Sequence, residues 1–421
     1  MNTGDIAFMS VCTALVFLMI PGLAFFYGGL VKKRHVLSIM IQSIAAIGII
    51  TILWVGIGYS LAFGPDVGHF IGNLDFAGLN NVGLEPKSEG ATIPHLLFVL
   101  FQLMFAIITP AIITGSTAER LRFPAYVLFI ALWSILVYAP LAHWVWGGGW
   151  LADLHILDFA GGMVVHISSG FSGLIAALVI GKRLNRENDP PIPHNMPYVL
   201  LGTGLLWFGW FGFNGGSELA ADGISVLAMT TTHISACAGL LGWMLIEKLH
   251  HGRPTVLGAL SGAVAGLGAI TPACAFVTPL AAIVIGLVST GLCYIGVAYL
   301  KEKLGYDDSL DAFGIHGIGG TWGTLATGIF CTTLVNPNGA DGLLYGSSAQ
   351  LLVQFLGVLA TYAYCGLATF VILKVVGLVT PLAASHEEQD SGLDITQHGE
   401  SAYTDLDGRT SVADPGWNIF N

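Results

Sequence analysis

The hydrophobic positions along this chain gather into long unbroken runs and do not alternate with polar positions. A helix that crosses a hydrocarbon core needs about 20 consecutive apolar residues, and eleven runs of roughly that length occur. They cover approximately residues 5–31, 36–63, 92–117, 122–143, 160–182, 197–217, 223–248, 255–271, 275–301, 309–333 and 347–377. The pattern predicts an all-α integral membrane protein with eleven transmembrane helices. The eighth run is short, and Pro272 is predicted to end it.

The short polar segments between these runs predict an orientation. Basic residues follow every odd-numbered run, for example "KKRH" after the first and "GKRLNR" after the fifth. Lys87 alone lies on the other side, against the remaining fourteen of 15 Lys and Arg residues. Because basic loops stay in the cytoplasm, we expect a multi-pass cell-membrane protein whose N-terminus is outside and whose C-terminus is cytoplasmic.

Composition supports the membrane assignment and distinguishes the C-terminal segment from the rest of the chain by its charge. The sequence is 54% hydrophobic and 10% charged, with a mean hydropathy of +0.75, whereas soluble domains carry about a quarter charged residues. The residues after Leu382 hold eight acids and only Arg409 as a base. We therefore expect a membrane domain over residues 1–380 and an acidic, regulatory cytoplasmic tail over 381–421.

The six cysteines occur singly in apolar runs. This pattern predicts that they are packing residues and that they form neither disulfides nor a metal site.

A short internal repeat relates two halves of the chain. Asp158 precedes His166 by eight residues, and Asp308 precedes His316 by eight. The sequence "FFYGG" at the end of the first run matches "GFNGG" at the end of the sixth. The matching runs are five apart, so the halves would have opposite orientations. This predicts two inverted five-helix repeats plus an eleventh helix, with a site near the midplane between the halves.

The two histidines reach a similar depth from opposite faces. At 1.5 Å per residue each lies about 12 Å inside the membrane, so in a core of about 30 Å their depths differ by only about 6 Å. They are predicted to meet. Separate interhelical hydrogen bonds are the alternative for either histidine alone, whereas a matched pair favours a pathway. Asp158 is expected to cap a helix N-terminus, as are Asp308 and Asp311 at the tenth run.

Aromatic residues gather at the outer ends of the runs. An interfacial belt of Trp and Tyr explains some of them, but not the deeper Phe105. Ring faces beside a hydroxyl also suit a small cation that is losing water, through cation–π attraction. The residues concerned are Phe101, Phe105, Trp144, Trp146, Trp210, Phe213 and Ser217.

Several motifs together resemble one family. The segment "DFAGGMVVHISSGFSGLIAALVIGKR" (158–183) is accompanied by "FFYGGLV", "FQLMFA", "TAERLRF", "HWVWGGG", "WFGFNGGS", "TPAC" and "DAFGIHGIGG". In this order they resemble the ammonium transporter family (the Amt/Mep/Rh group), close to its bacterial and archaeal members, over about residues 5–400. The resemblance implies eleven helices, a homotrimer and one pore in each subunit.

The resemblance also implies roles for residues at the matching positions. Ammonium would be recruited by Trp146, Phe105 and Ser217, with Phe101 close by, and a gate would be formed by Phe105 and Phe213. The pore would be lined by His166 and His316, while Asp158 shapes the vestibule and Trp210 and Thr271 lie beside the path. The tail "GLDITQHGESAY" resembles the segment that docks trimeric PII signal proteins in bacterial members, and here it continues through "TDLDGRTSVADPGWNIFN".

The expected function is therefore membrane transport of ammonium or ammonia. Whether the proton also crosses is left open, and an ammonium sensor of the same fold is the alternative. An enzyme with histidine-bound metal is disfavoured because no HxxxH or HExxH run occurs, and His250 and His251 are interpreted as solvated loop residues. We expect no cofactor and no nucleic-acid partner.

Overall fold

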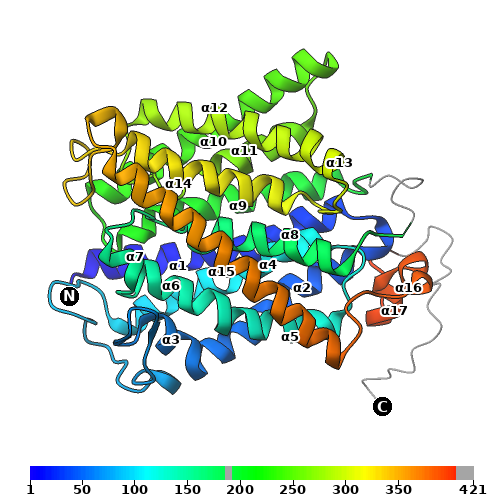
Figure 1. Cartoon of the computed structure of the whole chain (residues 1–421), viewed down its shortest axis with the longest axis horizontal. Helices are drawn as coiled ribbons and strands as arrows, with labels where there is room; N and C mark the ends of the chain where they lie inside the picture. The colour runs from blue at the N-terminus through cyan, green and yellow to red at the C-terminus, as the bar shows by residue number, and fades with distance from the viewer. Residues whose placement is uncertain (185–191, 404–421) are drawn as a thin grey trace.

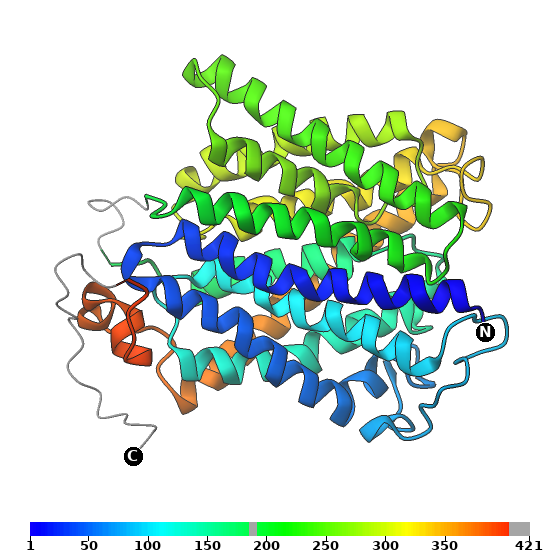
Figure 2. The same cartoon turned by 180° about the vertical axis from the view of Figure 1, so that it is seen from behind.

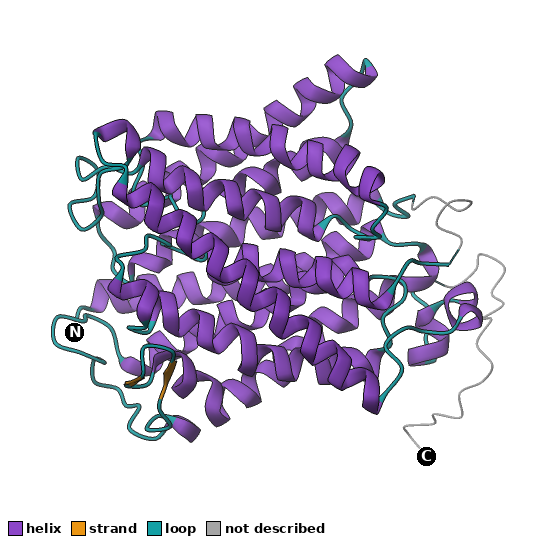
Figure 3. Ribbon diagram, viewed as in Figure 1, coloured by secondary structure: helices purple, strands orange, loops and turns teal. Residues whose placement is uncertain are grey.

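The computed structural model describes residues 1–184 and 192–403, which fold almost entirely into long helices packed side by side (Figures 1 and 3). The α-helices of the first half are α1 (Thr3–Leu30), α2 (Val36–Leu53), α3 (Tyr59–Phe63), α4 (His95–Thr117), α5 (Phe123–Trp133), α6 (Ala139–Trp146), α7 (Trp150–Asp153) and α8 (Ser168–Ile180). Those that follow are α9 (Met196–Gly215), α10 (Gly223–His251), α11 (Val256–Ile270), α12 (Pro279–Ile295), α13 (Lys301–Leu304), α14 (Ile318–Phe330), α15 (Ala349–Val379), α16 (His386–Ser391) and α17 (Leu393–His398).

Each of the eleven predicted runs contains a helix. Within the described residues, nine helical segments are long and apolar enough to cross a membrane. The helix of the eighth run, α11, has only 15 residues and ends at Ile270, before Pro272, as predicted. The prediction of a mostly helical, multi-pass membrane protein is therefore confirmed.

In the described parts of the chain, five of the helical segments contain a π-helical turn. These turns are η2 (Trp54–Gly58), η4 (Ser134–Tyr138), η5 (Gly162–Ile167), η7 (Gly296–Leu300) and η8 (Phe313–Gly317). Such a turn places one extra residue in the helix and often marks a functional position. Two of them, η5 and η8, carry His166 and His316.

The two ends of the helix bundle differ. The N-terminus lies at one end together with a hairpin of β1 (Asp66–Val67) and β2 (Ile71–Gly72), in which Asp66 pairs with Gly72, whereas α16 and α17 lie at the other end (Figures 1 and 2). Single 3₁₀ turns complete the loops: η1 (Lys33–His35), η3 (Ala77–Leu79), η6 (Gly216–Glu218) and η9 (Leu343–Tyr345).

Glycines bring the segments of the repeat into direct contact. A Cβ on Gly170 would lie 2.2 Å from the backbone of Gly317, and a Cβ on Gly162 would lie 2.8 Å from Thr324 Oγ1. The fifth and tenth helical segments therefore cross antiparallel with their backbones touching, as small residues allow in membrane bundles. This close crossing places the two histidine-bearing turns against each other.

A buried ion network closes the end of the bundle opposite the N-terminus. The Arg183 guanidinium donates to both carboxylate oxygens of Asp307, at 2.9 and 3.0 Å, and to Glu119 at 3.2 Å. Arg120 donates to the backbone carbonyl of Asp307 at 2.6 Å. Burial alone would raise the pKa of Asp307, but the hydrogen bonds from Arg183 and the charges of both arginines hold that pKa at about 2.

The described part of the tail packs onto this same end. Ala384 N donates to the carbonyl of Arg120 at 2.8 Å, and the Asp394 carboxylate accepts the backbone N–H of Ser38 at 2.7 Å. Tyr403 Oη lies 2.9 Å from His194 Nε2. Residues 381–403 thus contact the connection before α5, the first turn of α2 and the connection before α9. Arg409 and the rest of the predicted extension, 404–421, lie outside the described residues, as does the end of the "GKRLNR" loop.

Candidate functional site

Two aspartates start the histidine-bearing turns in the same way. Asp158 accepts the backbone N–H groups four, five and six residues ahead, at 2.5, 2.8 and 3.4 Å. Asp308 accepts the N–H groups at the same three offsets, at 3.1, 2.8 and 3.4 Å. Each carboxylate satisfies amides that have no partner within the helix. The predicted capping role is confirmed for both, and the shared pattern extends the repeat from sequence to hydrogen bonding.

His166 and His316 meet in the interior of the bundle. Their Nδ1 atoms are 3.2 Å apart, and their rings are nearly parallel, with centroids 5.2 Å apart. An Nδ1–Nδ1 hydrogen bond requires one nitrogen to donate and the other to accept, so the geometry suits a pair of neutral imidazoles. The predicted contact between the two halves is confirmed.

A continuous series of aromatic rings leads from the N-terminal end of the bundle to this pair. Trp146 meets Phe105 edge-on at 6.1 Å between centroids, and Phe105 lies 4.2 Å from Phe213. Phe213 in turn is 6.2 Å from the ring of His166. Trp146 is partly exposed, while Phe105 and Phe213 are each only 1% exposed. The two phenylalanines therefore lie buried and in contact with each other between Trp146 and the ring of His166.

The space beside the histidines is narrow and mainly apolar. A cavity of about 20 Å³ is lined by Phe213, Trp210 and both histidines together with aliphatic side chains of α1, α4, α9 and α11. Trp210 Nε1 donates to Thr271 Oγ1 at 3.0 Å, and this hydroxyl donates to Leu267 O at 2.8 Å. The polar atoms of Trp210 and Thr271 thus bond to protein, so the Trp210 ring presents an apolar wall.

Two other residues of the predicted recruitment site take different positions. Ser217 is partly exposed and donates its hydroxyl to Phe213 O at 2.8 Å, which leaves the oxygen lone pairs available to a cation. Phe101 is fully buried and packs against Phe105 at 5.0 Å between centroids. Phe101 therefore supports Phe105 from behind.

Comparison with known proteins identifies the family. The profile of the Ammonium Transporter Family matches residues 7–403. The ammonium transporter of Bacillus subtilis is 54% identical, over 96% of this chain and 100% of its own length. The chain belongs to the ammonium transporter family. It is accordingly a membrane transporter and not an enzyme.

Solved structures support the same fold for this transporter. The crystal structure of Mep2 from Saccharomyces cerevisiae superposes with a TM-score of 0.85 at 37% identity, covering 92% of this chain and 88% of Mep2. A structure described as a sensor Amt protein superposes with a TM-score of 0.86 at 28% identity, covering 94% of this chain and 98% of that one. The same architecture therefore occurs in a protein described as a sensor.

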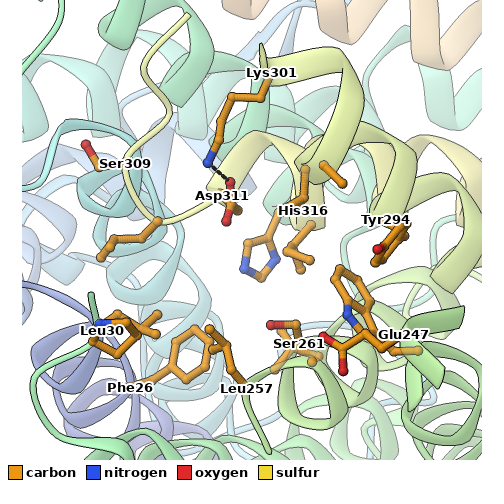
Figure 4. Close-up of a pocket in the computed structure, with 18 of the residues that line it drawn as sticks. Phe26, Leu30, Glu247, Leu257, Ser261, Tyr294, Lys301, Ser309, Asp311 and His316 are labelled. Atoms are coloured by element: carbon orange, nitrogen blue, oxygen red, sulfur yellow. Dashed lines mark hydrogen bonds and ion pairs between the residues drawn. The ribbon is translucent and has the colours of Figure 1, made fainter. Parts of the chain in front are cut away.

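On the far side of the histidines the transporter contains a larger cavity, of about 320 Å³. It is lined by His316, Phe26, Trp243, Glu247, Lys301 and Asp311, among others (Figure 4). Lys301 and Asp311 form an ion pair in its wall, close to His316 (Figure 4). His316 thus lies between the narrow apolar lumen and a wider vestibule whose wall contains charged side chains.

Two predictions at this end are wrong in detail. The Asp311 side chain does not cap the tenth helical segment, because it binds Lys301 and leaves the capping to Asp308. His250 and His251 belong to the last turn of α10 and not to a loop, and they bond to Tyr294 Oη at 2.7 and 3.1 Å.

The ion pairs at this end were missed as well, including Lys301 with Asp311 and the network of Asp307. The two residues of each ion pair are far apart in sequence or lie on different helical segments, so no sequence motif predicts these pairs. The only signal was an unusual density of acids in "DDSLD", residues 307–311.

Proposed function

We propose that this protein moves ammonium across the cell membrane by recruiting the cation outside, removing its proton and conducting neutral ammonia past His166 and His316. The observation that carries the proposal is the ring series from Trp146 to the histidine pair. The rings connect the partly exposed Trp146 to the mainly apolar cavity beside the histidines. Eleven crossings, an outer N-terminus and a cytoplasmic C-terminus complete the proposed topology.

Recruitment uses the rings and the hydroxyl at the outer mouth. Trp146 and Phe105 offer their π surfaces, and Ser217 offers an oxygen acceptor. A desolvated cation gains about 2 kcal/mol or more from such a ring. Phe101 holds Phe105 in place. Asp158 shapes the vestibule from behind, because its carboxylate is engaged by four backbone amides and its carbonyl accepts Trp146 Nε1 at 2.8 Å.

Deprotonation follows from the apolar walls of the lumen. A charged group in the hydrocarbon region costs at least about 2.5 kcal/mol, and the cavity beside the histidines has apolar walls. Neutral ammonia avoids this cost, and it can exchange hydrogen bonds with imidazole nitrogens. Potassium has no proton to lose, so the same lumen excludes it. Movement of the rings of Phe105 and Phe213 opens the way.

Residues 1–380 form the transport domain in this proposal, and 381–421 form a regulatory tail. The tail bridges cytoplasmic connections of the domain, so a partner that binds it can act on the membrane part. A trimeric PII signal protein is the proposed partner, and the transporter itself is proposed to be a homotrimer in the bilayer.

A second candidate function rests on the similarity to a protein described as a sensor. A sensor would bind ammonium at the same outer site but conduct little. Current from reconstituted protein under an ammonium gradient, with potassium as control, distinguishes the two. Ammonium-dependent current without potassium current supports electrogenic transport. Ammonia flux without current supports a neutral channel, and the absence of both supports the sensor.

A further inference from the structure

Trp146 and Lys301 make the same contact at opposite ends of the path. Trp146 Nε1 donates to the backbone carbonyl of Asp158 at 2.8 Å. Lys301 Nζ donates to the backbone carbonyl of Asp308 at 3.3 Å. Asp158 and Asp308 are the two capping aspartates of the repeat. The side chains that bind them therefore occupy corresponding places at the two mouths.

Their positions in the helices agree with this correspondence. Trp146 lies 23 residues after Phe123, the first residue of its helical segment, and Lys301 lies 22 residues after Pro279, the first residue of the matching segment. The match thus rests on helix position as well as on the shared hydrogen bond.

The outer and inner ends of the proposed path are lined by different side chains. By the "FFYGG" and "GFNGG" match, Phe26 corresponds to Phe213, and Phe26 lines the inner cavity. At the inner cavity α11 contributes Gly258, Ser261 and Val264, whereas α4 supplies large aromatic rings at the outer mouth. Trp243 and Tyr294 also line the inner cavity. By the repeat, however, Phe26 is the counterpart of the gate residue Phe213, and a primary ammonium group takes the place of the tryptophan.

The two carboxylates of the inner cavity are already engaged. Glu247 accepts the backbone N–H of Thr255 at 2.6 Å and its hydroxyl at 2.9 Å. Asp311 is bound by Lys301, which also holds the Asp308 carbonyl. The lysine head group is chemically an alkylammonium ion. It occupies the carboxylate and carbonyl oxygens that a free ammonium ion would bind.

We propose that Lys301 acts as a tethered substitute for ammonium: it fills a cation site formed by Asp311 and Asp308 O at the cytoplasmic mouth, so that ammonium is recruited from the outside more readily than from the inside. A group tethered beside its site competes at an effective concentration in the millimolar range. Free ammonium in the cytoplasm must displace it. This inference rests on the proposed function, because it assigns the inner mouth of the same path.

The effect appears in the apparent KM at each face and not in the direction of net flow. A passive path carries no net flux when the gradient is zero, so the ratio of maximal rate to KM must be equal in both directions. When Lys301 fills the inner site, the KM for ammonium at the cytoplasmic face rises, and the maximal rate of outward transport rises with it. Removing the lysine lowers this KM and this maximal rate, and the gradient still determines the direction of net transport.

The test measures ammonium-dependent current or flux in right-side-out and inside-out vesicles that contain the full chain. The unsubstituted protein is expected to show a higher KM at the cytoplasmic face than at the outer face. Lys301→Met should lower the inner KM by about tenfold, equivalent to about 1.4 kcal/mol, without changing the outer KM. Lys301→Arg should keep the high inner KM. Lys303→Met is the matched control, since this exposed lysine lies on the same helix outside the cavity.

A double variant distinguishes ammonium binding to Asp311 from other effects of losing the Lys301 charge. Lys301→Met with Asp311→Asn removes the carboxylate that a free ammonium would bind, so the inner KM should rise again toward that of the parent. An unchanged outer KM shows that each variant is folded, and Lys301→Gln replaces Lys301→Met if the latter does not accumulate.

The outcomes distinguish this inference from the proposed function. If the unsubstituted protein carries no ammonium or ammonia, the proposed function fails. If it transports but Lys301→Met leaves the inner KM unchanged, or the double variant matches Lys301→Met, the tethered-substitute inference alone is overturned.

Discussion

His166 and His316 face each other through their Nδ1 atoms at 3.2 Å, and His166 Nε2 is buried with no hydrogen-bond partner among the described residues. A buried polar atom without a partner costs about 1–3 kcal/mol. A molecule in the lumen that can donate or accept a hydrogen bond would remove this cost. The histidine pair therefore combines an internal hydrogen bond with a ring nitrogen that no described protein group binds, and both rings line the narrow cavity.

Replacing both histidines by alanine should reduce ammonium flux by at least about tenfold, because passing ammonia would lose both of its polar partners in an apolar lumen. The protein should remain folded, since the change removes two buried polar groups together. Flux into proteoliposomes and the elution volume of the purified protein check this. Normal flux in the double variant would remove the histidines from the proposed path.

Phe213→Ala should open the aromatic closure, because Phe213 and Phe105 lie with ring centroids 4.2 Å apart and both are buried. We expect a changed flux and a lower ratio of ammonium to potassium current, since water could then reach the lumen. Bi-ionic current measurements with the two cations check this. The exposed Phe208→Ala on the same helix is the matched control, and identical ratios for both variants would argue against the gate.

Much of the membrane architecture was predictable because it depends on patterns local to each segment. Long apolar runs marked the helices, and the Asp158–His166 spacing repeated at Asp308–His316 predicted that two distant residues meet. The pairing of charged side chains was not predictable. Lys301 and Asp311 lie in one polar stretch, where each had several possible partners. Only the folded backbone, with Asp308 as the cap, leaves Asp311 free to bind the lysine.

Asp307→Asn should destabilise the end of the bundle that carries the tail. Asp307 is 1% exposed and pairs with Arg183, so its loss leaves a buried guanidinium partly unpaired, at a cost of about 3–5 kcal/mol. A lower thermal unfolding midpoint in detergent is expected. Asp390→Asn, at an exposed position of α16, is the matched control, and equal midpoints for the two variants would contradict the structural role of the network.

The pH dependence of this network has a definite sign. The folded pKa of Asp307 is about 2, below its ordinary value of 3.8. The stabilisation of about 2 kcal/mol that follows is complete above pH of about 4 and is lost as pH falls through about 2. Above pH of about 4, Asp307→Asn should therefore lower the unfolding midpoint by a constant amount, and this difference should shrink at lower pH.

Deleting the residues after Pro381 should abolish binding of a trimeric PII protein and leave the membrane domain folded. The removed segment contributes α16 and α17, which contact the domain through hydrogen bonds such as Asp394 with Ser38 N and Tyr403 with His194. These contacts lie outside the apolar bundle, so the helix packing should survive. Pull-down with a PII protein and circular dichroism of the truncated protein check the two halves of the prediction.

A single substitution tests the contact between the tail and the membrane domain while the tail itself stays in place. Tyr403→Phe keeps the ring but removes the hydroxyl that lies 2.9 Å from His194 Nε2, at a cost of about 1 kcal/mol. It should leave PII binding intact while changing the ammonium flux, because the described tail would be held less firmly against the connection before α9. Retained PII binding in the truncated protein would place the docking surface elsewhere, and unchanged flux in Tyr403→Phe would mean that this contact does not couple the tail to transport.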